Sequence, residues 1–272
     1  MYKLIALDMD GTLLSEDKTI SKANFKAIQR AKAKGVKVVL ATGRPINGIK
    51  KYLKELNLVE AGDYAVAYNG ALVQRTKDGK IIADNPMNIE DLNYLYELSK
   101  KLKVHIHFLT ESKCVTTEIN EYSMVEATIN EIPLEVADFS KIPLDTNVVK
   151  IMFVDEANYL SKVVEQLPSE VYDKYTVVRS APYFLEFLNK KVNKGFGVGL
   201  LAENLGISHK EVICIGDAGN DIDMIKYAGL GVAMGNAFPE VKLIADYVTC
   251  TNEEDGVAKV INKFILEEEK VS

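Results

Sequence analysis

Short apolar runs alternate with helical patterns in the first and last thirds of this 272-residue chain, and this alternation is the strongest constraint on its fold. The expected strands are residues 4–7, 36–40, 64–68, 212–215, 230–234 and 247–250. The helical patterns are residues 21–34, 46–56, 196–205 and 222–227. A succession of strand, helix and strand at this spacing predicts parallel pairing through right-handed crossovers.

The middle of the chain lacks this regular order. Residues 72–83 predict a hairpin that turns at residues 77–79, and a helix at 89–102 is followed by scattered β-branched runs. One continuous domain is the alternative, but the flanking thirds complete one another without the middle. The predicted class is therefore α/β: a Rossmann-like parallel-sheet core formed by residues 1–83 plus 191–272, with an inserted α+β domain at residues 84–190.

Polar residues mark the ends of two expected helices. Ser21 is a suitable N-cap for the first helix, and Gly35 ends it. Near the carboxyl end, Thr251 and Glu254 have the spacing of a capping box at the start of a closing helix. The apolar residues expected on one face of this closing helix are Val257, Val260, Ile261, Phe264 and Ile265.

Charge and hydropathy argue against several classes of protein. The net charge is −6 and no basic block is present, so a nucleic-acid partner is not expected. No stretch approaches the roughly 18 apolar residues of a membrane helix, and Asp8 and Asp10 interrupt the early apolar run that a secretory signal would need. Three widely separated cysteines are expected as free thiols. These features predict a cytoplasmic protein without a membrane partner.

Two carboxylates follow the first expected strand. Residues 8–12 (Asp-Met-Asp-Gly-Thr) come directly after it, at the strand end where open α/β sheets place their ligands. Gly11 permits a sharp exit of the chain. A spacing of two lets one carboxylate serve as nucleophile and metal ligand while the other transfers a proton. Taken alone, the pattern is equally compatible with a surface turn.

Two further polar loops follow expected strands. Residues 41–44 (Ala-Thr-Gly-Arg) bring a hydroxyl and backbone N–H groups to the start of a helix, which suits an anion as well as a simple N-cap. Residues 216–221 (Gly-Asp-Ala-Gly-Asn-Asp) suit a hard cation, with Asp217 as the first candidate ligand. Asn220 can donate to a phosphate, and Asp221 can support a metal site or cap the next helix. A purely structural turn is the alternative here.

Lys194, at a helix start in residues 193–195 (Asn-Lys-Gly), decides nothing alone because an isolated lysine is usually a solvated surface charge. Taken together, the polar loops favour a functional site more strongly than any one of them does alone. Because each polar loop follows a parallel strand, all three are expected at one edge of the sheet.

In this order the four segments resemble the motifs of the haloacid dehalogenase superfamily of phosphotransferases, and within it the Cof-type sugar-phosphate phosphatases. Residues 231–237 (Gly-Val-Ala-Met-Gly-Asn-Ala) and 254–258 (Glu-Asp-Gly-Val-Ala) are similar to the signature of the Cof group, as are residues 68–71 (Tyr-Asn-Gly-Ala). The match runs from residue 3 to about residue 260, except across the insert.

The resemblance implies that Asp8 attacks the phosphoryl group and forms an aspartyl-phosphate. Asp10 would protonate the leaving oxygen and then deprotonate the hydrolytic water. Mg²⁺ would be held by the carboxylates of Asp8 and Asp217 and by the backbone carbonyl of Asp10. The phosphate oxygens would be held by the Met9 backbone, Thr42, Gly43, Lys194 and Asn220.

The resemblance also implies that the insert is a mobile cap that excludes water and contacts the leaving group. Its specificity residues and the roles of Asp221 and Arg44 stay open. Two features depart from the family pattern: Ala218 and Gly219 replace larger polar residues, and Gly197 and Gly199 are expected to make the helix that begins with Lys194 less rigid.

The expected function is thus a Mg²⁺-dependent phosphatase of small phosphorylated metabolites, sugar phosphates in particular, acting as a monomer or weak homo-oligomer. A phosphomutase, which returns the phosphate to a bound sugar, is one alternative. A phospho-ligand-binding protein with little turnover is another. The second acid, Asp10, argues against the binding protein, because it would hasten hydrolysis of a phosphorylated aspartate.

Overall fold

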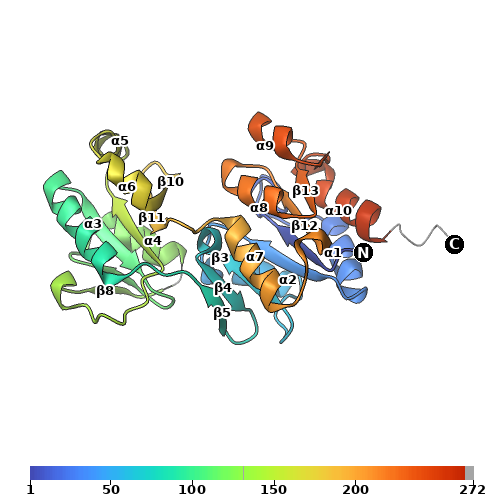
Figure 1. Ribbon diagram of the computed structural model, residues 1–272, viewed down its shortest axis with the longest axis horizontal. Helices are drawn as coiled ribbons and strands as arrows, with labels where there is room; N and C mark the ends of the chain where they lie inside the picture. The colour runs from blue at the N-terminus through green and yellow to red at the C-terminus, as the bar shows by residue number, and fades with distance from the viewer. Residues whose placement is uncertain (131, 267–272) are drawn as a thin grey trace. The chain divides into compact units, whose positions relative to one another are not determined.

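The computed structural model describes residues 1–130 and 132–266, which form two compact units with a β-sheet in each (Figure 1). The core unit takes Met1–Arg44, Ile49–Asp84 and Asn193–Ser272, and the inserted unit takes Pro45–Gly48 and Asn85–Val192. Helices accompany both sheets, so the expected α/β class is confirmed.

The core unit is built on an eight-stranded sheet in the order β14-β13-β12-β1-β2-β3-β4-β5. Its strands are β1 (Leu4–Leu7), β2 (Lys37–Ala41), β3 (Tyr64–Ala67), β4 (Leu72–Arg75), β5 (Ile81–Asp84), β12 (Val212–Gly216), β13 (Leu230–Ala233) and β14 (Tyr247–Val248). The pairs from β14 to β3 are parallel, and β4 and β5 add antiparallel pairs. Leu7 of β1 is level with Ile215 of β12 and with Leu40 of β2, so these three strands end together.

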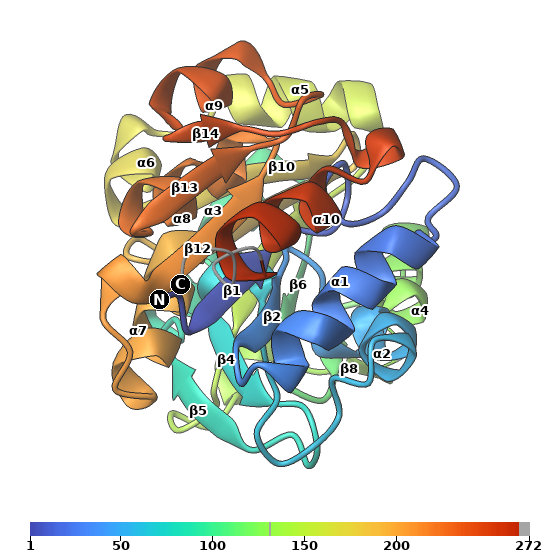
Figure 2. The same ribbon diagram turned by 90° about the vertical axis from the view of Figure 1, so that its right-hand side faces the viewer.

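Helices cover the core sheet and bury its apolar side chains. They are α1 (Lys22–Ala33), α2 (Ile46–Glu55), α7 (Lys194–Asn204), α8 (Ile222–Tyr227), α9 (Pro239–Ile244) and α10 (Gly256–Ile261). Leu201 of α7 and Met224 of α8 belong to the same buried cluster as Leu4 of β1. Each such buried side chain contributes about 1.5–3 kcal/mol of transfer free energy. Helices α1 and α10 lie side by side (Figure 2), and the Asn24 side chain accepts a 2.9 Å hydrogen bond from the Ala258 N–H.

The element predictions for the core unit hold closely, with one correction at the closing helix. The capping box of Thr251 and Glu254 closes the short 3-10 turn η5 (Asn252–Glu254), and Asp255 then takes a left-handed φ of 58°. The α-helix therefore begins only at Gly256, and it passes into the π-helical turn η6 (Asn262–Leu266). The change of helical period leaves Phe264 only half-buried, while the other four apolar residues of the predicted face are buried.

The inserted unit carries a six-stranded sheet in the order β10-β11-β9-β6-β7-β8, with antiparallel pairs except for β7 and β8. Its strands are β6 (His105–Leu109), β7 (Cys114–Thr116), β8 (Leu134–Val136), β9 (Lys150–Val154), β10 (Tyr175–Ala181) and β11 (Phe184–Asn189). Its helices are α3 (Ile89–Leu102), α4 (Glu121–Ile129), α5 (Ala157–Glu165) and α6 (Ser169–Lys174).

The two faces of the inserted sheet differ in chemistry. Alternate side chains such as Phe108 and Phe153 form an apolar core with α3, α5 and α6. Their neighbours along the strands, among them His107 and Lys150, are buried and bind polar side chains of α4. This polar seam explains why the middle of the sequence lacks a clean hydrophobic period.

Two expectations from composition can be compared with the structure directly. The three cysteines are unpaired, and Cys114 and Cys214 are buried. Across the described residues, every helix is too short or too polar to span a bilayer.

Candidate active site

The carboxyl end of β1 places Asp8 between two other strand ends. The Asp8 N–H donates to the Ile215 carbonyl at 3.0 Å, which ties the first residue after β1 to the carboxyl end of the strand β12. The Thr42 N–H, just after β2, donates to the Val66 carbonyl at 2.9 Å. The three polar loops therefore lie at one edge of the sheet, where parallel strands with crossover connections place them.

Lys194 joins two of these loops through its side chain. Its Nζ lies 2.5 Å from Asp8 Oδ1 and 2.6 Å from Asp221 Oδ1, and all three side chains are buried. The lysine is the first residue of α7, where the Asn193 side chain caps the helix by accepting from the Phe196 N–H. Lys194 is therefore buried and does not lie on the surface, where an isolated lysine is usually found.

Burial and neighbouring charges shift the pKa values of this pair. Burial, together with the charges of Asp221 and Asp217, raises the pKa of Asp8 to about 7 against the opposing effect of Lys194. Burial alone would lower the pKa of Lys194, but the charges of Asp8 and Asp221 raise it above its ordinary value. Lys194 therefore stays positively charged. The two acids near Asp8, Asp217 and Asp221, bring more negative charge than the single ammonium group of Lys194 can balance.

Asp217 adds a third carboxylate. One oxygen from each of Asp8, Asp217 and Asp221 lies within 4.8 Å of the others. The Thr12 hydroxyl donates to Asp217 Oδ1 at 2.9 Å, and Gly11, at φ 82°, leaves no room for a side chain, since a Cβ there would lie 2.4 Å from Asp217 Oδ2. Burial and the charge of Asp221 raise the pKa of Asp217. Oxygen donors with surplus negative charge are the ligands a hard divalent cation takes.

Asp221 is the anchor of the cluster. Its Oδ1 binds Lys194, and its Oδ2 accepts from the N–H groups of Asp217 and Ala218 at 2.9 and 3.0 Å. Because both oxygens are already engaged, Asp221 is better suited to fix the loop and Lys194 than to bind a metal. The sequence alone leaves two roles open for Asp221, support of a metal site and cap of the following helix, α8.

Asp10 points its carboxylate at two cations. Arg44 binds it through Nε at 2.9 Å and Nη2 at 2.7 Å, and Lys18 Nζ lies 2.8 Å from Oδ1. Burial acts to raise the pKa of Asp10, but the hydrogen bonds and charges of Lys18 and Arg44 outweigh it and lower the pKa below its ordinary value. Arg44, whose role the sequence left open, is therefore a partner of Asp10.

The remaining predicted phosphate ligands surround these carboxylates. The Thr42 hydroxyl oxygen accepts from the Arg44 N–H at 3.1 Å, and Asn220 Nδ2 donates to Asn69 Oδ1 at 3.1 Å. Gly43, the residue after Thr42, lies against the same Asn69 side chain: a Cβ added to it would be 3.1 Å from Asn69 Oδ1. Asn69 had no predicted role, although the Asn-Gly pair after a strand signals a left-handed turn.

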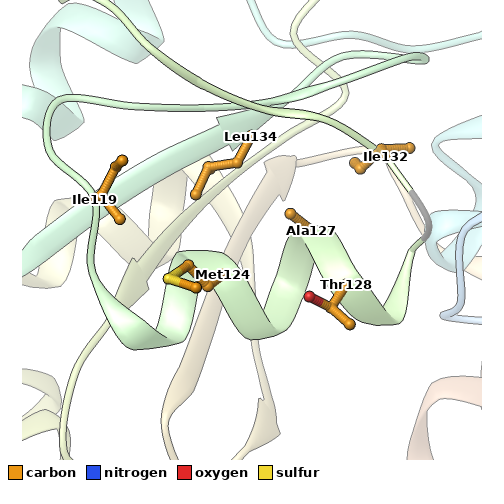
Figure 3. Close-up of a pocket in the computed structure, with 6 residues that line it drawn as sticks. All are labelled: Ile119, Met124, Ala127, Thr128, Ile132 and Leu134. Carbon is orange, nitrogen blue, oxygen red and sulfur yellow. The ribbon is translucent and has the colours of Figure 1, made fainter.

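The inserted unit offers a cleft of about 470 Å³ on α4 (Figure 3). It is lined by Ile119, Met124, Ala127, Thr128, Ile132 and Leu134. None of these six side chains carries a charge, so the cleft itself lacks the groups that bind a phosphate.

Comparison with known proteins agrees with this geometry. The family model of the haloacid dehalogenase-like hydrolases matches residues 5–261. The Bacillus subtilis (strain 168) protein named "Putative phosphatase YxeH" is 47% identical over 268 residues, which cover 98% of this chain and 99% of that protein. A crystal structure of a haloacid dehalogenase-like hydrolase from Bacteroides thetaiotaomicron is 39% identical, with a TM-score of 0.82 and coverage of 96% and 99%. The subclass IIB sugar phosphatase BT4131 is 28% identical, with a TM-score of 0.76 and coverage of 96% and 98%.

The chain therefore belongs to the haloacid dehalogenase-like hydrolases, the superfamily that its four motifs resemble. Within that family it is a phosphoric monoester hydrolase.

Proposed function

We propose that this enzyme is a Mg²⁺-dependent phosphatase that hydrolyses small phosphorylated metabolites, sugar phosphates in particular, through an aspartyl-phosphate on Asp8. The observation that carries the proposal is the buried Asp8 carboxylate at the end of β1, bound by Lys194 and adjacent to Asp217. The relationship to BT4131, a sugar phosphatase, supports the substrate class.

Asp8 is the nucleophile in this proposal. One carboxylate oxygen attacks phosphorus, the bond to the leaving oxygen breaks, and an acyl phosphate forms. Both reactants are anionic, so the reaction needs fixed positive charge at the attacked group. Lys194 supplies part of it from a position set by Asp221, 2.6 Å away. Preorganised charge in a water-poor site is the main contribution that an enzyme makes to phosphoryl transfer.

The metal ligands are proposed to be the carboxylates of Asp8 and Asp217 and the backbone carbonyl of Asp10. The donor set fits, because one carboxylate oxygen from each of Asp8, Asp217 and Asp221 lies within 4.8 Å of the others, and Lys194 binds two of these three acids with a single ammonium group. When bound, Mg²⁺ neutralises charge on the nucleophile and on the phosphoryl oxygens. Thr12 contributes by holding Asp217 in place through its hydroxyl.

Asp10 is the proposed acid and base. With Arg44 and Lys18 bound to it, its carboxylate is deprotonated, which is the form needed to take a proton from the hydrolytic water. Protonating the leaving oxygen in the first step needs the opposite form. Asp10 must then carry a proton and give up part of its contact with these cations.

The phosphate oxygens are proposed to bind the Met9 backbone, Thr42, Gly43, Lys194 and Asn220. Thr42 supports this role because its hydroxyl oxygen is used as an acceptor from the Arg44 N–H, which leaves the hydroxyl proton for an anion. Asn220 has two amide protons and uses one on Asn69.

The inserted unit, predicted at residues 84–190, is proposed to act as the cap. It has its own sheet and its own apolar core, so it can move as a body. Its connections at Asp84–Asn85 and Val192–Asn193 suit a hinge.

The decisive experiment is a screen for released inorganic phosphate with Mg²⁺ over sugar phosphates, nucleotides and pyridoxal phosphate. We expect turnover of several sugar phosphates. Conversion of a hexose phosphate to its isomer without free phosphate would instead identify a phosphomutase. Absence of phosphate release over the whole panel would remove the proposal.

A further inference from the structure

The turn η1 (Tyr68–Gly70), between β3 and β4, has an uncommon backbone. Tyr68, Asn69 and Gly70 have φ angles of 50°, 53° and 96°. Residues with a Cβ rarely adopt this left-handed conformation, and two in succession persist only where the surrounding structure holds them. Both side chains are buried, with exposures of 3% for Tyr68 and 7% for Asn69. Strain of this kind collects at functional sites.

The backbone of η1 is bonded to the loop after β2. The Asn69 N–H donates to the Thr42 carbonyl at 2.9 Å, and the Tyr68 N–H donates to the Arg44 carbonyl at 3.2 Å. These bonds fix the path of the chain on both sides of Gly43. The loop that brings the Thr42 hydroxyl to the sheet edge is therefore attached to η1.

The same turn lies against the first turn of α7. A Cβ on Gly70 would be 2.1 Å from the Asn193 carbonyl oxygen, and a Cβ on Gly197 would be 2.7 Å from the Gly70 Cα. The glycine at 197 thus allows close packing beside Lys194, a reason that differs from the loss of rigidity expected from the sequence.

The side chain of Asn69 reaches the fourth polar loop. Its Oδ1 accepts from Asn220 Nδ2 at 3.1 Å. Asn220 itself is an exposed residue in a turn. Accepting one amide proton orients the second one, so the bond to Asn69 restricts the direction in which Asn220 can donate.

From these contacts we propose that Asn69 is a positioning residue of the phosphate site, an inference that rests on the proposed function. It holds Asn220 through its side chain and Thr42 through its backbone, while its neighbour Gly70 packs at the start of the helix that begins with Lys194. Asparagine suits the position for two reasons. It tolerates a left-handed backbone, and it offers an acceptor without a negative charge that would repel phosphate.

Asn69→Gly tests the side chain alone, because glycine adopts the left-handed backbone without strain. We would measure KM and kcat with p-nitrophenyl phosphate and Mg²⁺, and titrate inorganic phosphate as a ligand. We expect KM and the phosphate dissociation constant to rise about tenfold, with kcat changing less, as for loss of a hydrogen bond that orients a phosphate ligand. Tm is expected to stay within about 2 °C of the wild type.

Asn57→Gly is the matched control. Asn57 has the same left-handed conformation, with φ 54°, but it is exposed and contacts Gln29 and Lys32 rather than the polar loops. This variant should bind phosphate like the wild type. If both glycine variants weaken phosphate binding equally, the effect is a general one of the substitution and the inference is wrong.

A double variant tests whether Asn69 acts through Asn220. If it does, Asn69→Gly combined with Asn220→Ala binds phosphate no more weakly than Asn220→Ala alone. Full additivity of the two losses would overturn the inference, and so would wild-type phosphate binding by Asn69→Gly. A wild-type enzyme that binds phosphate but hydrolyses no substrate would instead remove the proposed function. Phosphate titration does not depend on turnover, so the two failures can be told apart.

Discussion

Two buried lysines, one in each unit, are bound by pairs of carboxylates in nearly the same way. In the core unit, Lys194 lies 2.5 Å from Asp8 and 2.6 Å from Asp221. In the inserted unit, Lys150 lies 3.0 Å from Glu126 and 2.9 Å from Glu186. The lysine side chains are 0% and 3% exposed, so desolvation penalises both clusters.

The clusters differ in what else surrounds the acids. In the inserted unit, each carboxylate also accepts a hydrogen bond from a neutral side chain: Asn130 donates to Glu126 at 2.8 Å, and Ser180 donates to Glu186 at 2.7 Å. In the core unit the additional neighbour of Asp8 is another acid, Asp217. A buried ion cluster satisfied by neutral donors ties a helix to a sheet. A cluster with an additional acid beside it, like that of the core unit, has the negative charge that suits the proposed cation.

The largest expected effect is on activity and separates the clusters by their acids. Asp8→Asn should lower phosphatase activity by about 10⁴-fold or more, because the nucleophile is lost, while the fold is kept. Glu186→Gln, its counterpart in the inserted unit, should keep kcat with p-nitrophenyl phosphate within about fivefold of the wild type. Phosphate release and circular dichroism on both variants measure the contrast. If Asp8→Asn retains most of its activity, Asp8 is not the nucleophile.

The second prediction separates the clusters by their lysines. Lys150→Met leaves Glu126 and Glu186 buried without their counter-ion and should cost about 3–5 kcal/mol of unfolding free energy, with kcat of the folded protein preserved. Lys194→Met should instead abolish turnover, whatever its effect on stability. Urea unfolding and steady-state kinetics on the two variants check this. Equal loss of kcat in both would erase the distinction between a structural and a reactive cluster.

The third prediction uses pH within the inserted unit. His107 is fully buried beside Ser123, and burial, aided by the charge of Lys150, lowers its pKa to about 3. The folded state therefore binds fewer protons than the unfolded state below pH 6.5. Stability is kept above pH 6.5 and lost as pH falls, by about 2 kcal/mol at pH 5. In His107→Gln this part of the pH dependence should disappear from urea unfolding curves. An unchanged slope would assign it to other groups.

The smallest expected effect concerns the proposed metal site of the core unit. Because the pKa of Asp8 is raised to about 7, protons compete with Mg²⁺ below that pH. Without metal, the extra proton on folded Asp8 makes stability fall as pH rises from about 4 to 7, and Mg²⁺ should offset this loss. Titrations followed by thermal unfolding should give roughly fivefold weaker Mg²⁺ binding at pH 6 than at pH 7. Binding independent of pH would place the metal away from Asp8.

Much of the core unit could be predicted because its signals are local. The apolar run of β1 and the polar residues directly after it locate Asp8, and β2 and β12 repeat the pattern before Thr42 and Asp217. What could not be predicted depends on tertiary contacts. Lys18 and Arg44 meet Asp10 only through the folded loops, and nothing in the spacing shows that Asp221 supports Lys194.

The inserted unit was less predictable for a related reason. Helix α4 buries Ser123 and Glu126 against the polar seam, so its sequence lacks the apolar stripe of an ordinary surface helix. Strand β8 has three residues and is largely exposed, which leaves no period to detect. For these reasons α4 and β8 are not predicted from the sequence. Strands β7 and β11 are not predicted either, although both are largely buried.

The position of β1 in the middle of the core sheet also determines when the contacts of its loop can form during synthesis at the ribosome. Thr12 is among the first residues to be synthesised, yet its hydrogen-bond partner Asp217 is 205 residues further along the chain. At about 5–20 residues per second, the loop after β1 waits on the order of 10–40 s for this partner. The whole inserted unit, which ends at Val192, is therefore synthesised before Asp217 can join the loop after β1, and the site at the sheet edge is completed only near the end of synthesis.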